Sequence, residues 1–552
     1  MFTRLSSSGG RTYLQLVEAY RTESGATRQR LIANLGRLDQ LEPRHLDPLI
    51  NGLNRALGRS ANPAHPVEYD SALAYGDVYA LHQLWSDLGF GEVFRRVLRS
   101  SRRSFDAEAL VRAMVFNRLC DPESKLGVLR WLDTVAIPGM PASVSHDHLL
   151  RTMDAISDHA DAIEQKLSEH IRPLIDQELS VVFYDLTTVR IHGEAVLEDD
   201  LRAYGMNKET AGIARQFVLG LVQTADGLPL MHTVHAGNVA ETRTLQSMLE
   251  GVLKRFSVKR VILVADRGLL SMDNVGQLTE LAERNRERRI EFILAVPARR
   301  YAELGGTMDT LQFTDGLAEG RFANQRLVVA HDPVRATEQA ARRRARIAEI
   351  ETLAERMTGK LDAQDEGLTE RGRRATDRGA YSRFARAVAD AELSRFIHAD
   401  YQAERFSYTV DTDAIAHAER FDGKLVLLTN VTDFGAAEIV SRYKSLADIE
   451  RGFRVLKSDI EIAPVYHRLP ERIRAHAQIC FLALVLYRVM RMRLKASGNS
   501  LSPTSALQLL GRIQQHRATI GEHTYRGISR MTAQQTQIFQ DLNLPKPASK
   551  AL

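Results

Sequence analysis

The sequence predicts a multidomain α/β protein. Residues near the N-terminus alternate polar and apolar side chains as strands do, residues 72–175 have helical periodicity, and in residues 181–300 β-prone runs alternate with helical ones. At 552 residues the chain is too long for one compact core. We therefore expect several domains built around a central α/β part.

The expected domain boundaries lie where the sequence pattern changes. The parts are an N-terminal β-rich module (1–65), a helical domain (66–176), a first core segment (177–300), an insertion (301–438), a second core segment (439–498) and a C-terminal region (499–552).

Composition limits the classes of function. Lys and Arg number 74 against 69 Asp and Glu, and this mildly basic balance suits an anionic partner where the positive charge clusters. Two cysteines in separate segments exclude a disulfide framework and indicate a reducing cytoplasm. The apolar run at 479–487 is shorter than the ~20 residues of a membrane span. Neither a P-loop nor a GxGxxG pattern is present, so we expect no nucleotide cofactor.

One arginine cluster lies in the helical domain. FRRVLRSSRRS contains no acidic residue, and we expect it either to be a solvated face or to contact DNA phosphates. Its arginines are Arg95, Arg96, Arg99, Arg102 and Arg103.

The central region predicts the order β-β-β-α-β-α-β. The strand VVFYDLTTV has Asp185 at its middle, and Asp266 follows the later apolar run VKRVILVA. Strands disfavour Asp, so Asp185 needs a partner: a salt bridge, a capping interaction or a metal. Residues 301–438 then predict a helical hairpin or coiled-coil arm, with Ile350, Leu353, Met357 and Leu361 as its seam and strands that close it.

A third carboxylate is expected on an amphipathic helix over 443–460. Tyr443, Leu446, Glu450 and Lys457 are spaced by three, four and seven residues, so they fall near one face. Taken alone, Glu450 fits a structural salt bridge to Arg454 or Lys457.

Together these motifs resemble a bacterial insertion-sequence DDE transposase of the IS-four superfamily, in its sixteen-thirty-four group. The matching pieces are YDLT around Asp185, GLPLMHTVHAGN, VADRG around Asp266, and Y-x2-R-x3-E-x6-K at Tyr443, Glu450 and Lys457. The chain departs from that last pattern at Leu446, where the family has Arg, and Arg454 is a candidate substitute.

The resemblance implies a ribonuclease H-like catalytic core interrupted by a large insertion. Asp185, Asp266 and Glu450 would be both the catalytic and the metal-binding residues, holding two Mg2+ ions, for which Mn2+ would substitute. Tyr443, Lys457 and Arg454 would hold DNA phosphates.

The implied function is cleavage at transposon ends and transfer of the 3′-OH ends to target DNA. The expected partners are double-stranded terminal repeats and target DNA, bound by a homodimer in a synaptic complex in the bacterial cytoplasm, associated with the nucleoid. Two alternatives stay open: a nuclease with the same core that does not join strands, and a non-catalytic DNA-binding protein derived from a transposase.

Overall fold

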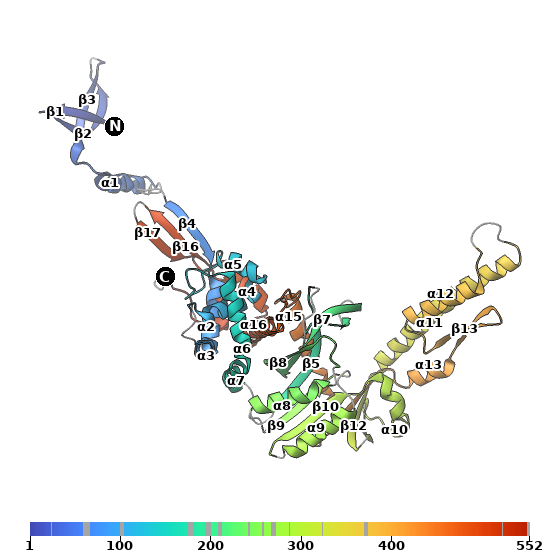
Figure 1. The fold of residues 1–552 in the computed structure, drawn as a ribbon. Helices are drawn as coiled ribbons and strands as arrows, with labels where there is room; N and C mark the ends of the chain where they lie inside the picture. Colours follow the sequence, from blue (N-terminus) through green and yellow to red (C-terminus); the bar gives the residue numbers. More distant parts are fainter. Residues whose placement is uncertain are drawn as a thin grey trace. The chain divides into compact units, whose positions relative to one another are not determined.

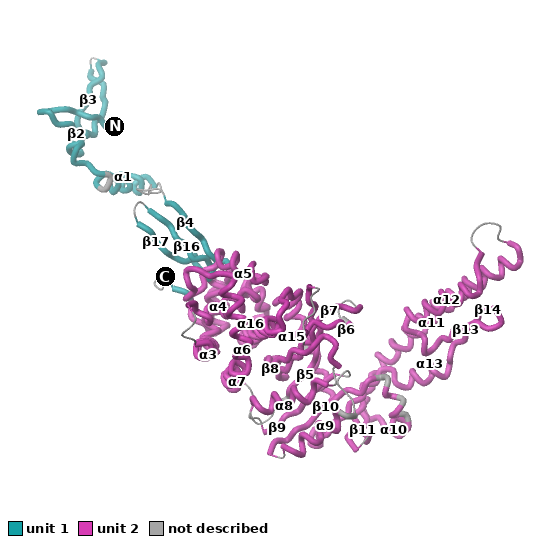
Figure 2. The backbone as a smooth tube through the Cα atoms, in the orientation of Figure 1, with its two compact units in different colours: residues 1–75, 512–532, 547–552 teal, residues 76–511, 533–546 magenta. Residues whose placement is uncertain are grey.

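The computed structural model describes most of the chain. The described residues are 1–23, 25–58, 67–99, 104–174, 180–193, 200–207, 212–240, 243–256, 259–266, 272–285, 287–322, 324–368, 374–520 and 523–548. They form two compact units: residues 1–75, 512–532 and 547–552, and residues 76–511 and 533–546 (Figure 2). The chain is mixed α/β, as the sequence predicts.

The first unit contains two small antiparallel sheets. Strands β1 (Phe2–Ser8), β2 (Arg11–Arg21) and β3 (Thr27–Arg37) form a meander that precedes helix α1 (Pro43–Ala56). Gly9 and Gly10 connect β1 to β2 with positive φ angles of 57° and 74°, which a two-residue hairpin turn requires. The second sheet joins β4 (Val67–Ala74) to β16 (Gln514–Ile520) and β17 (His523–Ile528).

The helical part of the second unit is organised around one buried helix, α16 (Pro470–Ala496), which packs against α4, α6 and α2 (Figure 1). By length and composition α16 could cross a membrane, but 94% of its apolar stretch is buried inside the protein, as in the core helix of a soluble protein. The surrounding helices are α2 (Gly76–Asp87), α3 (Phe90–Val97), α4 (Ala107–Cys120), α5 (Lys125–Leu132), α6 (His146–Asp158), α7 (Ala160–Ile171), α17 (Pro503–Leu510) and α18 (Ala533–Asp541).

A nine-stranded sheet forms the centre of the second unit. Its order is β11-β12-β15-β10-β9-β5-β7-β6, and β8 also pairs with β7. Strands β10, β9 and β5 are parallel, whereas β7 pairs with β5 in the antiparallel sense. The strands are β5 (Ser180–Arg190), β6 (Ala203–Asn207), β7 (Gly212–Thr224), β8 (Pro229–Ala236), β9 (Arg260–Ala265), β10 (Arg289–Ala295), β11 (Leu317–Phe322), β12 (Gln325–His331) and β15 (Lys424–Thr429).

Hydrophobic pattern explains why β5 and β9 lie in the middle of this sheet. All six residues of β9 except the first are fully buried, which is typical of a parallel strand covered on both faces. The intervening helices are α8 (Leu245–Arg255) and α9 (Met272–Arg284), and α9 packs against β10. The β7–β8 connection contains the predicted Asp226–Gly227 turn, in which Gly227 has a φ of 79°.

Residues 333–419 add a largely helical segment between β12 and β15, and α10 lies between β10 and β11. These elements are α10 (Gly305–Thr310), α11 (Pro333–Asp365), α12 (Asp377–Asp390), β13 (Ile397–Gln402), β14 (Arg405–Val410) and α13 (Thr412–Glu419). Helices α11 and α12 pack together around Ile350, Phe384 and Phe406. Leu353, which the sequence placed on the seam, is half-buried and lies outside this cluster, whereas Ala354 is fully buried.

Candidate active site

Two aspartates lie at the same level of two neighbouring parallel strands. In the β5–β9 ladder Tyr184 pairs with Ala265. Asp185 and Asp266 directly follow these two paired residues, so they lie at the same level of the two segments. Neighbouring strands lie about 4.8 Å apart, and carboxylates at this spacing can contact a common ion.

Asp185 belongs to β5 itself and is half-buried between fully buried neighbours. Its Oδ1 accepts a hydrogen bond of 2.7 Å from the backbone N–H of Leu186. That bond holds the carboxylate close to its own backbone.

Asp266 follows the last residue of β9 and is exposed. The Tyr443 hydroxyl donates a hydrogen bond of 2.8 Å to Asp266 Oδ1. Tyr443 lies on helix α14 (Ala436–Lys444), which packs on β9 and β10. The structure therefore brings together two residues that the sequence singled out 177 positions apart.

The expected single helix over 443–460 is wrong. Helix α14 ends at Lys444, residues 445 and 446 form a turn, and α15 (Ala447–Ser458) follows. The Ser445 hydroxyl donates to the carbonyl of Ser441, and the Leu446 N–H donates to the carbonyl of Tyr443 instead of the residue four back. Such local bonds divert the backbone from regular α-helix. Tyr443 and Glu450 consequently lie on different helices.

Helix α15 carries Glu450 and packs against β5 and α16. Phe453 and Leu456 are buried on its inner side, while Glu450 and Arg454 are exposed and Lys457 is half-buried. Glu450, Arg454 and Lys457 are separated by four and three residues, so they share one face. Among the ion pairs of the described residues, none joins Glu450 to Arg454.

Close packing at Gly452 sets how near α15 comes to the sheet. A Cβ built at Gly452 would lie 3.2 Å from Gln223 Oε1 on β7 and 3.4 Å from Arg488 Nη2 on α16. Gln223 is fully buried, and neither Oε1 nor Nε2 has a hydrogen-bond partner among the residues that the structure describes. The sequence reasoning missed Gln223, although a Gln ending the apolar run FVLGLV was a visible signal.

The carboxylates of Asp185 and Asp266 are suitable ligands for a hard divalent cation. Aspartate and glutamate oxygens are the ligands that Mg2+ prefers, and the ion keeps several waters, so two or three carboxylates suffice. Asp185 and Asp266 provide adjacent donors. Among the described residues, however, no group of three or more His, Cys, Asp or Glu side chains is placed to hold a metal ion.

The arginine cluster begins at the end of α3. Arg95 and Arg96 lie in its last turn and Arg99 follows it, and all three are exposed. Arg95 Nε donates to the carbonyl of Gly91 at 3.0 Å. Arg102 and Arg103 lie outside the described residues.

Comparison with known protein families agrees with this arrangement. Residues 3–64 match the model "IS1634 family transposase, N-terminal domain". Residues 176–486, more than half of the chain, match the model "Transposase DDE domain", and this range includes Asp185, Asp266 and Glu450. A search of curated proteins found no match.

Proposed function

Because the chain belongs to the DDE transposases of the IS1634 family, we propose that it cleaves phosphodiester bonds at the ends of its element and transfers the 3′-OH ends to target DNA. The observation that carries this proposal is the parallel register of β5 and β9, which makes Asp185 and Asp266 neighbours. We further propose that the sheet with its flanking helices is a ribonuclease H-like core, into which residues 301–438 are inserted.

In this proposal three carboxylates act together as metal ligands. Asp185, Asp266 and Glu450 would hold two divalent ions, Mg2+ or in its place Mn2+, with Asp185 shared between them. Bound there, the ions would activate the attacking hydroxyl and neutralise the charge on the leaving oxygen. The exposure of Asp266 and Glu450 leaves both carboxylates accessible to DNA and to solvent ions.

The remaining side chains would position the DNA. The Tyr443 hydroxyl holds the Asp266 carboxylate in one orientation. Lys457 and Arg454 present positive charge on the same face as Glu450, where they would contact phosphates next to the cleaved bond. Arg95, Arg96 and Arg99, with Arg102 and Arg103, would contribute phosphate contacts to end binding. A homodimer acting on paired ends in the bacterial cytoplasm would complete the reaction.

A cleavage assay tests the proposal. The substrate is a labelled duplex that carries the DNA bordering the gene, incubated with Mg2+ or Mn2+. Wild type is compared with Asp185→Asn, Asp266→Asn and Glu450→Gln, and with two matched controls, Asp226→Asn in the exposed β7–β8 turn and Glu283→Gln on the exposed face of α9.

We expect the three site variants to lose cleavage by at least about a thousandfold while DNA binding persists, and both controls to stay active. Normal cleavage by Glu450→Gln would remove Glu450 from the site. Cut ends without joined products would favour a nuclease that does not transfer strands. Binding without any cleavage by wild type would favour a non-catalytic DNA-binding protein.

A further inference from the structure

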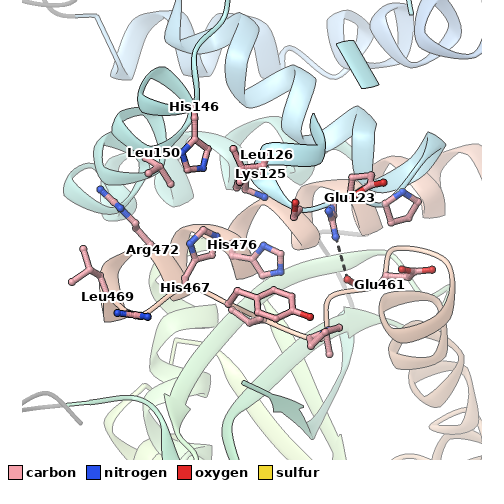
Figure 3. Close-up of a pocket in the computed structure, with 18 residues that line it drawn as sticks. Glu123, Lys125, Leu126, His146, Leu150, Glu461, His467, Leu469, Arg472 and His476 are labelled. Atoms are coloured by element: carbon pink, nitrogen blue, oxygen red, sulfur yellow. Dashed lines mark hydrogen bonds between the residues drawn. The ribbon is translucent and has the colours of Figure 1, made fainter. Parts of the chain in front are cut away.

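A second functional feature is a large pocket in the second unit, formed by α5, α6, the start of α16 and residues 461–469 (Figure 3). Its volume is about 840 Å3, which is within the range of small-molecule sites and far larger than a single ion needs. The function proposed above uses none of its lining residues.

The pocket wall contains a buried lysine without a counter-ion. Lys125 is 6% exposed, and in the described part of the chain no ion pair of Lys125 is formed. Burial and the nearby Arg118 lower the pKa of Lys125 to about 7. An isolated ammonium group is costly to bury, and a bound anion would offset that cost and favour the protonated form of Lys125.

Arg118 adds a second buried cation with unused hydrogen-bonding capacity. Its Nη1 donates to the carbonyl of Glu461 at 3.2 Å, but its buried Nε has no hydrogen-bond partner in the described part of the chain. The two other lining arginines differ: Arg468 is exposed, and Arg472 is neutralised by Asp154, with bonds of 2.7 and 2.9 Å. Among the residues that the structure describes, neither Lys125 nor Arg118 forms an ion pair with a carboxylate.

Helix termini add to the positive potential. Ser124 and Lys125 are the N-cap and first residue of α5, His146 is the first residue of α6, and Leu469 is the N-cap of α16, and all of them line the pocket. Each N-terminus is the positive end of a helix dipole. Pro470 at the start of α16 has no N–H, and the N–H groups of Gly127 and His148 already donate to the capping hydroxyls of Ser124 and Ser145. Three such termini around one cavity favour an anion.

The histidines agree with a positive environment. His146, His467 and His476 line the pocket together with Lys125 (Figure 3). Burial and the charges of Lys125 and Arg472 lower the pKa of His467 to about 3. His476 Nε2 lies 3.0 Å from the carbonyl of Ile462, while its buried Nδ1 has no hydrogen-bond partner among the described residues.

Two carboxylates also line the pocket, and they do not neutralise Lys125. Glu123 lies 3.8 Å from the exposed Arg130, and Glu461 is exposed. In Figure 3 both lie toward one end of the hollow, away from His146 and His467. The buried cations therefore face a space that needs an anion from outside the chain.

We propose that this pocket is a phosphate-binding site, in which Lys125 and Arg118 contact a phosphate group carried by a nucleotide, either free or within a DNA strand. A phosphate suits a buried ammonium and guanidinium beside the positive ends of helix dipoles. The pocket volume leaves room for the sugar and base attached to that phosphate.

The test is ligand-induced thermal stabilisation of the full chain. The probes are inorganic phosphate, a nucleoside monophosphate and a 5′-phosphorylated single-stranded oligonucleotide, each against sodium chloride of equal ionic strength. The variants are Lys125→Met and Arg468→Gln at the pocket, and Lys495→Met, which removes an exposed lysine from the far end of α16.

We expect wild type and Lys495→Met to be stabilised equally by phosphate, and Lys125→Met to bind at least about tenfold more weakly. Arg468→Gln, whose exposed side chain is dispensable for folding, is expected to bind severalfold more weakly. If the oligonucleotide competes with inorganic phosphate for the pocket, the phosphate group comes from a DNA strand. If only the monophosphate competes, it comes from a free nucleotide.

The proposal is overturned if none of the probes stabilises wild type, or if Lys125→Met responds as wild type does. Asp185→Asn keeps this test separate from the catalytic proposal. That variant is expected to retain the full response to phosphate, whatever its cleavage activity.

Discussion

The Tyr443 hydroxyl donates a 2.8 Å hydrogen bond to Oδ1 of Asp266, and this bond joins helix α14 to the end of strand β9. A carboxylate that follows the last residue of a strand has few constraints of its own. A bond from a half-buried phenol on a packed helix holds it in one orientation. We therefore expect Tyr443 to position the carboxylate of Asp266.

Removing this hydroxyl should slow cleavage without unfolding the protein. Tyr443→Phe keeps the ring and loses one hydrogen bond to a charged group, so we expect cleavage to fall about tenfold or more. Tyr401→Phe, on the exposed strand β13, is the matched control. Comparing the rates at rising Mg2+ concentration checks the role, because a positioning defect is partly overcome by more metal, whereas a loss of DNA contact alone is not.

The pair of aspartates could be anticipated from the sequence, because each strand is a continuous apolar run followed or interrupted by one Asp. Parallel pairing of two such strands brings the two aspartates to the same level of the sheet. The separation of α14 from α15 could not be anticipated, because the 3.6-residue spacing continues through Ser445, and the turn is marked by local bonds: Ser445 to Ser441 and Leu446 to Tyr443. Leu446 is buried at this junction, so an arginine there would lose its solvation.

The pairing of strand β4 with β16 is a second feature that the sequence pattern did not predict. Residues 67–74 form a strand whose partner β16 lies more than 400 residues away. Their alternation is weak, and much of the strand is exposed, so no local pattern indicated the pairing. The same holds for β11 and β12, which extend the central sheet from within residues 301–438.

Replacing the carboxylate of Asp185 by a softer thiolate ligand should change which metal ion supports cleavage. Asp185→Cys replaces a carboxylate by a thiol, which binds Mg2+ poorly and Mn2+ better. We expect this variant to be inactive with Mg2+ and to recover measurable cleavage with Mn2+. Asp185→Ala should stay inactive with both ions, and equal behaviour of the two variants would argue against a metal contact at this position.

The exposed face of α15 should contribute to DNA affinity without sequence preference. Lys457→Met and Arg454→Met each remove one positive charge beside Glu450. For a phosphate contact, the slope of log affinity against log salt concentration decreases by about 1 per residue. Fluorescence anisotropy at several salt concentrations measures this slope, and Lys495→Met, on another helix, should leave it unchanged.

Stability should fall as the solution becomes acidic because a buried histidine stays neutral. His232 stacks on Phe481 with ring centroids 4.9 Å apart, and burial, with a smaller contribution from Arg255, lowers its pKa to about 4. The unfolded chain takes up this proton near pH 6.5 and the folded chain only near pH 4, so stability is lost as pH falls across that window.

His232→Leu removes that proton uptake and should lose less stability between pH 6.5 and 4. The difference is at most about 3 kcal/mol for one such group. Denaturant unfolding followed by fluorescence of the buried Trp85 and Trp131 gives the free energies. The exposed His523 serves as the control, and a His523→Leu variant should follow the wild-type pH dependence.

The close approach of α15 to the sheet provides the last test. Alanine is favoured over glycine within a helix by about 1 kcal/mol, so Gly276→Ala on α9, where a Cβ meets nothing within 4 Å, should stabilise the protein. Gly452→Ala gains the same propensity, but its Cβ would press on Gln223 and Arg488 at 3.2 and 3.4 Å. We therefore expect a smaller gain or a net loss of stability.

The two glycine variants should also differ in activity. A shift of α15 by a few tenths of an ångström displaces Glu450 relative to Asp185, and catalysis is sensitive to misplacement of this kind. Cleavage by Gly452→Ala should fall several-fold while Gly276→Ala keeps the wild-type rate. Equal rates for both variants would mean that the distance between α15 and β5 does not control the reaction, and that Glu450 acts from a position tolerant of movement.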